Sequence, residues 1–359
     1  MPKTNYYGLI MAGGRGTRFW PRSRRRSAKQ VLRFISSQSL IQETVARLSP
    51  LIPPERIWVL TNDFLRAEIV RQLPQVPKRQ IIAEPAQRNT APCIGLAAHI
   101  LQSIDPDAVM GVFPADHVIT KPSAYLRLLS PAFREADRGS LVVLGMQPRW
   151  PETGYGYIEF PEGTQPGSRE PLAVQRFREK PDLETAKEFV ASGRFYWNAG
   201  MFFWRAGVYL EALRRHLPRT ATLLAGLPAF SSRKFNRVLA EAYPLCENVS
   251  VDYAVMEKAS GVMGIAAGDI GWNDVGSWNA VYELLPRDAD GNVASGDVLF
   301  HTSRGNYVQT QNRLVALLGI ENLVVVDTED ALLVADRSRA QQVGEIVKIL
   351  EKRKREDLL

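Results

Sequence analysis

The chain has 359 residues, of which 45% are hydrophobic and 23% charged, as is ordinary for a soluble globular protein with one large and one smaller domain. No apolar run is long enough to span a membrane, no secretory signal is visible, and two cysteines, Cys93 and Cys246, exclude a disulfide framework, so we expect a cytoplasmic protein. The net charge of +7 raises the alternative of a nucleic-acid-binding protein, so the position of the basic residues matters.

The first predicted element is a strand at residues 7–11, which runs directly into a glycine-rich turn. Gly13, Gly14 and Gly16 allow positive φ angles and close approach to a ligand, so their N–H groups can converge on an anion. Basic side chains follow them along the chain. We therefore favour a phosphate site over a plain turn beside a solvated basic face.

Much of the positive charge lies in the first fifty residues, where a single acidic residue, Glu43, accompanies Lys3, Arg15, Arg18, Arg22, Arg24, Arg25, Arg26, Lys29, Arg33 and Arg47. A basic face for RNA stays open, but neither an RNA-binding motif nor interleaved aromatic residues accompany it. The dinucleotide fingerprint fails because Phe19 stands where it needs glycine, and the Gly-Lys-Ser/Thr ending of a P-loop is missing. A small polyphosphate accounts for the charge and for the glycines.

Strands and helices then alternate. Ser39 and Gln42 form a capping box at the start of one helix, and Asn62 caps the next. The helices are expected at residues 39–48, 62–72, 90–103 and 123–137, and the strands at 57–61, 80–83, 108–113 and 140–145. This order predicts an α/β fold, Rossmann-like, with a mostly parallel sheet, helices on both faces and ligands at the carboxyl ends of the strands.

The rhythm changes after residue 145. We expect strands at 155–160, 173–178 and 201–205 and helices at 183–192, 206–216 and 252–259, which together elaborate the same sheet into a lid for a second substrate. Residues 286–292 are the clearest linker. The predicted domains are therefore a catalytic domain at 1–285, this linker, and a small C-terminal β domain with a terminal helix at 293–359.

Short strands are expected in the C-terminal domain at 296–300, 306–308, 314–318, 323–326 and 331–335, and no long internal repeat is visible. In the terminal helix an apolar stripe is formed by Val343, Ile346, Val347 and Leu350. We interpret this stripe as packing within the chain. A homodimer contact is the minority interpretation.

Two aspartates are candidate ligands of a metal ion. Asp116 follows a buried strand at the ligand-binding end of the sheet, where a carboxylate can hold Mg²⁺ together with phosphate oxygens and water. Asp274 lies in a glycine-rich segment in which Ser277, rather than Asp274, can cap the following helix. A helix cap is the alternative role for Asp116. One carboxylate from each half of the domain would hold one ion between two phosphate-bearing substrates.

A second group of residues suits a sugar phosphate. Glu179 and Lys180 end a strand before a proline, and in a cleft Lys180 can hold a phosphate while Glu179 accepts hydrogen bonds from sugar hydroxyls. The runs Gly154-Tyr155-Gly156-Tyr157 and Trp197-Asn198-Ala199-Gly200 supply rings, an amide and bare backbone. Aromatic strand residues are more often core, so these runs count only as members of the set.

The segment from Glu84 to Pro92 joins a strand to a helix N-terminus, where unpaired N–H groups favour an anion or a polar base edge. Glu84 can accept from the N1–H and exocyclic amine of guanine, a donor pattern that adenine lacks. No Ser/His/Asp or Cys/His nucleophile set is present. Attack of one phosphate on another needs no base, because the nucleophile is already an anion and the protein must only align and neutralise two polyanions.

Eight motifs in order, over residues 7–285, resemble the mannose-1-phosphate guanylyltransferases of the sugar-phosphate nucleotidylyltransferase family: LIMAGGRGTRFWPRSR…KQ, EPAQRNTAP, FPADH, TGYGYI, FREKP, WNAGMFFW, VDYAVMEKA and GWNDVGSW. The resemblance implies transfer of GMP from GTP to mannose 1-phosphate with Mg²⁺, and a small β-helix-like unit after the catalytic domain. Longer relatives continue into an isomerase domain, so we expect no isomerase activity.

The resemblance also implies roles for individual residues. Arg18, Lys29 and Lys180 would be catalytic, and Asp116 and Asp274 would bind the metal. The nucleotide would contact Ala12, Gly13, Gly14, Arg15, Gly16, Thr17, Glu84, Arg88, Asn89 and Thr90. The sugar phosphate would contact Gly154, Tyr155, Gly156, Glu179, Asn198 and Asp252.

One position departs from the family pattern. The family usually has proline immediately before the Lys-Gln pair, where this chain has Ala28, so the backbone before Lys29 is less restricted. Three alternatives stay open: another nucleotidylyltransferase with a different base or hexose, a non-catalytic regulatory homologue, and a nucleic-acid-binding protein. GTP and mannose 1-phosphate are the expected partners, without nucleic acid or membrane.

Overall fold

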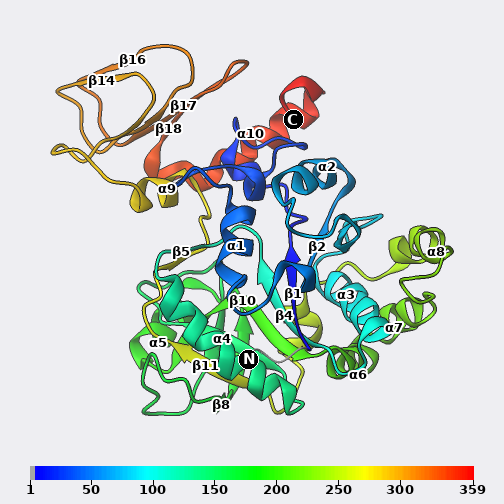
Figure 1. Ribbon diagram of the computed structural model, residues 1–359. Helices are drawn as coiled ribbons and strands as arrows, with labels where there is room; N and C mark the ends of the chain where they lie inside the picture. The colour runs from blue at the N-terminus through cyan, green and yellow to red at the C-terminus, as the bar shows by residue number, and fades with distance from the viewer. Residues whose placement is uncertain (1–4) are drawn as a thin grey trace.

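The computed structural model describes residues 5–359, so Lys3 of the basic cluster lies outside it. A ten-stranded sheet forms the centre of the larger part of the molecule (Figure 1). Its main path runs β3-β2-β1-β4-β10-β6-β11-β8, with β7 paired to β10 and β9 to β7. The strands are β1 (Tyr6–Met11), β2 (Ile57–Thr61), β3 (Ile81–Ala83), β4 (Val109–Pro114), β6 (Val142–Met146), β7 (Gly156–Glu159), β8 (Leu172–Ala173), β9 (Arg176–Glu179), β10 (Phe195–Arg205) and β11 (Met263–Ala267).

Most strands of this sheet point the same way. β1 is parallel to β2 and β4, β2 to β3, and β6 to β11, while β10 runs antiparallel between β4 and β6. Since β10 opposes both neighbours, β4 and β6 share one direction. The Rossmann-like, mostly parallel α/β class expected from the sequence is confirmed.

Helices cover both faces of the sheet. Side chains alternate across each strand, so both faces carry apolar side chains that the helices bury. Within β1, Ile10 enters one core with α1, α2, α4 and α5, and Leu9 enters the other with α3, α6, α7 and α8. These helices are α1 (Leu40–Leu48), α2 (Asp63–Gln72), α3 (Thr90–Ile104), α4 (Pro122–Asp137), α5 (Leu183–Ser192), α6 (Ala206–His216), α7 (Pro218–Ala225) and α8 (Phe235–Ala242). No helix in residues 5–359 has the length and apolar character that crossing a membrane requires.

Local signals set the helix starts correctly. Ser39 and Gln42 form the predicted capping box on α1, and the Asn62 side chain accepts from the Leu65 N–H at the start of α2. Ser277 stands at the N-cap of α9 (Trp278–Leu284), but its side chain makes no capping bond, so that detail of the prediction is wrong. Cys93 and Cys246 are buried free thiols.

The second half of the catalytic domain differs more from expectation. The strand predicted at 173–178 is two strands, β8 and β9, which pair with different partners. The strand predicted at 201–205 is only the end of β10, which begins at Phe195 and carries a bulge between Asn198 and Phe202. The helix predicted at 252–259 is a short π-helical turn, Asp252–Met256. Helices α7 and α8 and the strands β5 (Val118–Ile119), β11 and β12 (Trp272–Asn273) were not predicted.

The C-terminal unit is a short coil of parallel strands, which projects from the body in Figure 1. β13, β15 and β17 stack in parallel with β18 antiparallel at the edge, and β14 stacks on β16. Asn292, Asn306 and Asn322 each immediately precede a strand, a repeat that we missed. The strands are β13 (Val293–Ser295), β14 (Val298–His301), β15 (Tyr307–Gln309), β16 (Val315–Leu318), β17 (Leu323–Asp327) and β18 (Leu332–Asp336).

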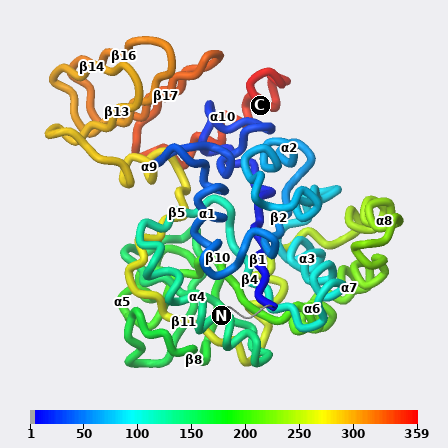
Figure 2. Tube along the Cα trace, viewed as in Figure 1, coloured from blue at the N-terminus to red at the C-terminus, as the bar shows by residue number. Residues whose placement is uncertain are grey.

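The terminal helix α10 (Val343–Lys352) packs back on the start of the chain, and the Figure 2 trace shows it beside the segment after β1. Val343 and Val347 of its stripe are buried in a core that includes Phe19 and Trp20, and Ile346 and Leu350 pack against it. The predicted packing within the chain is confirmed. The same core contains Trp278 of α9 and Tyr307 of β15, so it joins the C-terminal unit to the glycine-rich segment.

Candidate active site

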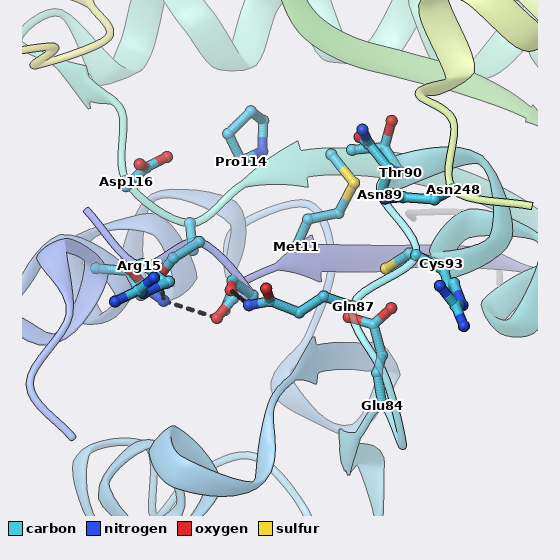
Figure 3. A pocket seen from close by; sticks show the side chains of 16 residues that line it. Met11, Arg15, Glu84, Gln87, Asn89, Thr90, Cys93, Pro114, Asp116 and Asn248 are labelled. Atoms are coloured by element: carbon cyan, nitrogen blue, oxygen red, sulfur yellow. Dashed lines mark hydrogen bonds between the residues drawn. The ribbon is translucent and has the colours of Figure 1, made fainter. Parts of the chain in front are cut away.

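A cavity of about 580 Å³ lies at the carboxyl ends of β1 and β4, beside the start of α3 (Figure 3). Figure 3 shows Asp116 and Arg15 at one end of the cavity and Glu84 toward the other, with Met11 between them. Most of the predicted nucleotide-binding residues line it: Ala12, Gly13, Gly14, Arg15, Glu84, Arg88, Asn89 and Thr90.

The glycine-rich loop presents unused donors at this cavity. Its carbonyl groups are held, because Gln30 donates to the oxygens of Ala12 at 2.7 Å and Gly14 at 3.0 Å, and Gln87 donates to that of Gly13 at 3.3 Å. Among the hydrogen bonds of residues 5–359, none uses a backbone N–H from Gly13 to Arg18. A run of free amides beside fixed carbonyls is suited to bind an anion.

Lys29 links the loop to both predicted metal ligands. Its Nζ lies 2.9 Å from Oδ2 of Asp116 and donates to the backbone oxygen of Asp274. Gly16 makes this possible, since its φ is 61° and a Cβ there would lie 2.6 Å from Cβ of Lys29. Ala28 has φ −72° and ψ 165°, values that a proline would also adopt, so the backbone before Lys29 has a conformation compatible with the usual proline.

Asp116 and Asp274 lie in contrasting electrostatic settings. Burial opposes ionisation of Asp116, but the Lys29 ammonium, His117 and the hydrogen bonds to the carboxylate together outweigh burial and hold the pKa of Asp116 below its usual value. Near Asp274 lies Tyr155, whose pKa is raised by burial and then by the Asp274 carboxylate. Burial lowers the pKa of His117, next to Asp116, to about 4, so this imidazole is neutral at physiological pH.

A second cavity, of about 250 Å³, adjoins the first and shares Met11, Thr90 and Pro114 with it. It contains all the residues predicted to bind the sugar phosphate, together with Lys180 and one of the two aspartates: Gly154, Tyr155, Gly156, Glu179, Lys180, Asn198, Asp252 and Asp274. The structure therefore brings together residues that lie far apart in the sequence.

The second cavity holds two carboxyl groups with raised pKa values. Burial, reinforced by the carboxylate of Asp252, raises the pKa of Glu179 to about 7. Burial also raises the pKa of Asp252, whose Oδ1 accepts from Nδ2 of Asn198 at 2.8 Å. Oε2 of Glu179 is buried and has no hydrogen-bond partner within the described part of the chain, and a Cβ at Gly156 would collide with it. An unpaired buried acceptor is costly, so this oxygen is suited to a ligand hydroxyl.

Lys180 has a strained backbone. Its φ is 46°, a conformation that non-glycine residues rarely adopt, and its N–H donates to the carbonyl of Tyr155 at 3.2 Å. Its side chain is 55% exposed and pairs with Glu179 at 3.3 Å. Strain of this kind is typical of functional positions.

At the other end of the first cavity, Tyr243 donates a hydrogen bond to Oε1 of Glu84. Burial raises the pKa of Glu84 to about 7. The prediction of unpaired amides at the start of α3 is corrected for its first residues: the Thr90 N–H donates to the Asn89 side chain, the Ala91 N–H donates to the Val249 carbonyl, and Pro92 has no N–H. Side chains, rather than a helix terminus, define this end.

Four predicted residues line neither cavity: Gly16, Thr17, Arg18 and Lys29. Gly16 and Lys29 pack together beneath the loop, and Thr17 faces the terminal helix, where a Cβ on Gly344 would lie 3.2 Å from its Oγ1. Arg18 is exposed, and its positive charge acts to lower the pKa of Tyr155 in the second cavity.

Several residues of the site carried no recognisable signal. Gln30, His117 and Trp272 lie within the predicted motifs, but the sequence predicted no role for them. In the structure, Nε1 of Trp272 donates to Nδ1 of His117 at 3.2 Å. Tyr243 begins a short 3-10 turn directly after α8, and Asn248 lies in the irregular segment that follows. Only the fold brings them to the cavity.

The basic run beyond Arg18 contacts the C-terminal part of the chain. Arg22 donates to Gln309 at 3.2 Å, Arg24 pairs with Asp330 at 2.8 Å, and Arg25 pairs with Glu356. The side chain of Arg22 is also partly buried, and this burial lowers the pKa of its guanidinium. These arginines hold two parts of the chain together, so they do not form a free basic face.

The profile of the nucleotidyl transferase family matches residues 7–291, a range that contains both cavities. The chain belongs to the nucleotidyl transferase family. A second profile, described as a MannoseP isomerase/GMP-like beta-helix domain, matches residues 296–350 and agrees with the coil of parallel strands.

Relatives within the nucleotidyl transferase family are similar over nearly the whole chain. The mannose-1-phosphate guanylyltransferase of Klebsiella pneumoniae is 42% identical over 353 residues, which covers 97% of this chain and 74% of that protein. One from Escherichia coli is 42% identical over 351 residues with the same coverage. A crystal structure titled mannose-1-phosphate geranyltransferase, from Thermus thermophilus, has a TM-score of 0.85 at 34% identity and covers 97% of this chain and 100% of that one.

The residues at the junction fit a hard divalent cation. Asp116 and Asp274 offer carboxylate oxygens, the ligand type that Mg²⁺ prefers. No cluster of three or more His, Cys, Asp or Glu side chains suited to a metal occurs in the described range. Such an ion would therefore need oxygens from substrate phosphates or water to complete its shell.

Proposed function

We propose that this protein transfers GMP from GTP to α-D-mannose 1-phosphate and so produces GDP-mannose and pyrophosphate. The observation that carries the proposal is the junction of two cavities, at which Lys29 contacts both Asp116 and Asp274. One cavity has free backbone amides suited to an anion, and the other has buried acceptors suited to hydroxyl groups. The names of the relatives supply the two substrates.

In the proposed reaction a phosphate oxygen of the sugar phosphate attacks the α-phosphorus of GTP. The bond from that phosphorus to the bridging oxygen of the β-phosphate breaks, and pyrophosphate leaves with the electron pair. No proton has to be removed, because the attacking phosphate is already an anion. The protein positions two polyanions in line and stabilises the charge of the transition state.

Each end of the site then has a separate task. In this proposal the free amides of Gly13, Gly14 and Arg15 and the Arg15 side chain bind the triphosphate in the first cavity, with Gly16, Thr17 and Arg18 next to them on the loop. Lys29, which pairs with Asp116, neutralises charge where the two phosphates meet. Lys180 binds the phosphate group of the sugar phosphate. The sugar hydroxyls exchange hydrogen bonds with Glu179, Asn198 and Asp252. Glu84 accepts from the guanine edge, with Arg88, Asn89 and Thr90 beside it.

Members of this family generally use a divalent metal ion, and we propose Mg²⁺ held by Asp116 and Asp274. When bound, it neutralises phosphate charge and orients the phosphate oxygens. We further propose that the protein acts in the cytoplasm on these small molecules, without a nucleic-acid or membrane partner.

The decisive experiment measures pyrophosphate release with GTP, ATP, UTP or dTTP, each combined with mannose, glucose or galactose 1-phosphate and Mg²⁺. We expect release to be fastest with GTP and mannose 1-phosphate. Activity with another pair would place the protein elsewhere in the family. If no pair releases pyrophosphate, the proposed enzymatic activity is refuted and a regulatory homologue is favoured.

A nucleic-acid-binding function is the alternative from another class. It would need the basic run to be free, whereas Arg22, Arg24 and Arg25 contact the C-terminal part of the chain. Salt-dependent binding of duplex or single strands that GTP does not displace would support this alternative.

A further inference from the structure

Arg15 makes an ion pair that its place in the nucleotide cavity does not require. It lies between Gly14 and Gly16 on the loop and lines the cavity, yet its Nη2 donates to Oε1 of Glu351 at 2.7 Å. Glu351 belongs to α10, 336 positions later in the chain. The two side chains are 41% and 36% exposed, so the pair is partly open to solvent.

Helix α10 is a firm support for Glu351. Val343 and Val347 are buried in the core shared with Trp20, and the indole of Trp20 donates to the Leu358 carbonyl at 3.0 Å. Gly344 lies so close to the loop that a Cβ there would be 3.2 Å from Oγ1 of Thr17. The position of α10, and so of the Glu351 backbone, relative to the loop is thus set by packing.

Arg15, by contrast, has little else to order its side chain. Its backbone oxygen accepts from Ser23 at 2.8 Å, but the flanking glycines give no side-chain support, and within residues 5–359 its guanidinium donates to Glu351 alone. A long flexible side chain loses much rotamer freedom when it binds a ligand. An ordered Arg15 would bind a phosphate at a smaller entropic cost.

We propose that Glu351 is a positioning residue that orients Arg15 toward the triphosphate. The inference rests on the proposed function, because GTP is taken as the ligand of the cavity. A guanidinium has five N–H donors in a planar fork, so a bond from Nη2 to Glu351 leaves other donors for a phosphate. The terminal helix thereby contributes to nucleotide binding without contacting the nucleotide.

The test compares Glu351→Gln with the wild type in steady-state kinetics. We expect the KM for GTP to rise about fivefold, the size of effect that an exposed ion pair can exert, with kcat and the KM for mannose 1-phosphate within about twofold. Glu345→Gln is the matched control, because it removes the same charge from the same helix and Glu345 makes no ion pair with any residue from 5 to 359. An unchanged KM for GTP would refute the proposal. A lower KM would instead show that Glu351 competes with the triphosphate for Arg15.

A double-mutant cycle separates positioning from a structural role. Arg15→Ala should raise the KM for GTP by more than Glu351→Gln, and adding Glu351→Gln to Arg15→Ala should change nothing further. The same loss in both backgrounds would overturn the proposal, because Glu351 would then act independently of Arg15. Wild-type activity keeps the two hypotheses apart: an inactive wild type refutes the proposed function, whereas an active wild type with an unaltered Glu351→Gln variant refutes only this inference.

Discussion

Ala28 has the backbone of a proline without being one. Its φ of −72° and ψ of 165° suit the proline ring, and no hydrogen bond in the described chain uses its N–H. Ala28→Pro should therefore raise the free energy of unfolding by about 0.5–1 kcal/mol, because the unfolded chain loses conformations. Urea denaturation measures this. Since Ala28 is only 1% exposed, a loss of stability would show that the ring does not fit the space.

Lys180 allows a test of the sugar-phosphate end. Lys180→Ala should raise the KM for mannose 1-phosphate at least about tenfold, because a charge-assisted phosphate contact is lost, while the KM for GTP stays within about twofold. The control is Lys187→Ala on α5, which removes only an exposed ion pair with Glu184. Equal effects of Lys180→Ala on both substrates would contradict its proposed place in the second cavity.

Glu84 should make GTP binding depend on pH. Burial raises its pKa from 4.5 to about 7, and only the carboxylate can accept both guanine donors. The KM for GTP should therefore rise about tenfold as pH falls from 8 to 6, since the ionised fraction falls by that factor. Protonation of the triphosphate contributes to any such profile, so Glu84→Gln is the comparison, and it should flatten the profile at a high KM. An identical profile in the variant would remove Glu84 from base recognition.

The same titration has the opposite sign for stability. With rising pH the unfolded chain loses the Glu84 proton from about pH 4.5 and the folded chain only near pH 7. The contribution of Glu84 to the free energy of unfolding therefore falls between these values and stays low above pH 7.

Site residues could be predicted where a motif contained a suitable side chain close to an end of a predicted strand. Examples are Asp116, Glu179 and Asn198, which the fold places at the two cavities. The sequence could not supply the neighbours that set their properties. Tyr243, which donates to Glu84, comes 159 positions later, and no spacing rule relates the two. Roles assigned by resemblance stay predictions until variants are measured.

At the scale of an element, the glycine-rich loop depends on one close approach. A side chain at position 16 would need a positive φ and would push into Lys29, so Gly16→Ala should lower kcat at least about tenfold by moving that ammonium. Gly163→Ala is the matched control, because its φ is 79° but nothing lies within 4 Å of the added Cβ. Both variants lose about 1–2 kcal/mol to the left-handed backbone, but only Gly16→Ala should lose activity. Equal activity in both would show that the contact does not place Lys29.

Elements with a complete local signal were predicted to within a residue or two, as for α1 and α5. Prediction failed where partners far along the chain decide the structure. β10 begins six residues before its predicted start because its first residues pair with β7, and the segment at 173–178 divides because β8 and β9 have different neighbours. The Asn292, Asn306 and Asn322 repeat was hidden by the shortness of the strands that it precedes.

At the scale of the whole molecule, one core joins the catalytic domain and the C-terminal unit. Phe19 and Trp278 from one side pack with Tyr307 and Val324 from the other. We therefore still propose the division at residues 286–292 as a boundary of chain organisation, but we expect a single cooperative unfolding transition in calorimetry. Two separate transitions would contradict this coupling.

Surface charge should matter less to that transition than the shared core. Asp330→Asn removes the pair with Arg24, and because the aspartate is 49% exposed the variant should lower the free energy of unfolding by no more than about 1 kcal/mol. Trp278→Ala should cost about 3–5 kcal/mol, because its ring is fully buried and its indole donates to the Trp20 carbonyl.

The residues that line both cavities, Met11, Thr90 and Pro114, also affect which nucleophile can react. Met11 and Pro114 cannot accept a proton, and His117 nearby is neutral with Nδ1 accepting from Trp272, which assigns its proton to Nε2. Water would need a base to become a strong nucleophile, whereas a sugar phosphate arrives already charged. In the proposed reaction, therefore, Met11, Pro114 and His117 give water no base beside the α-phosphorus, whereas the sugar phosphate needs none.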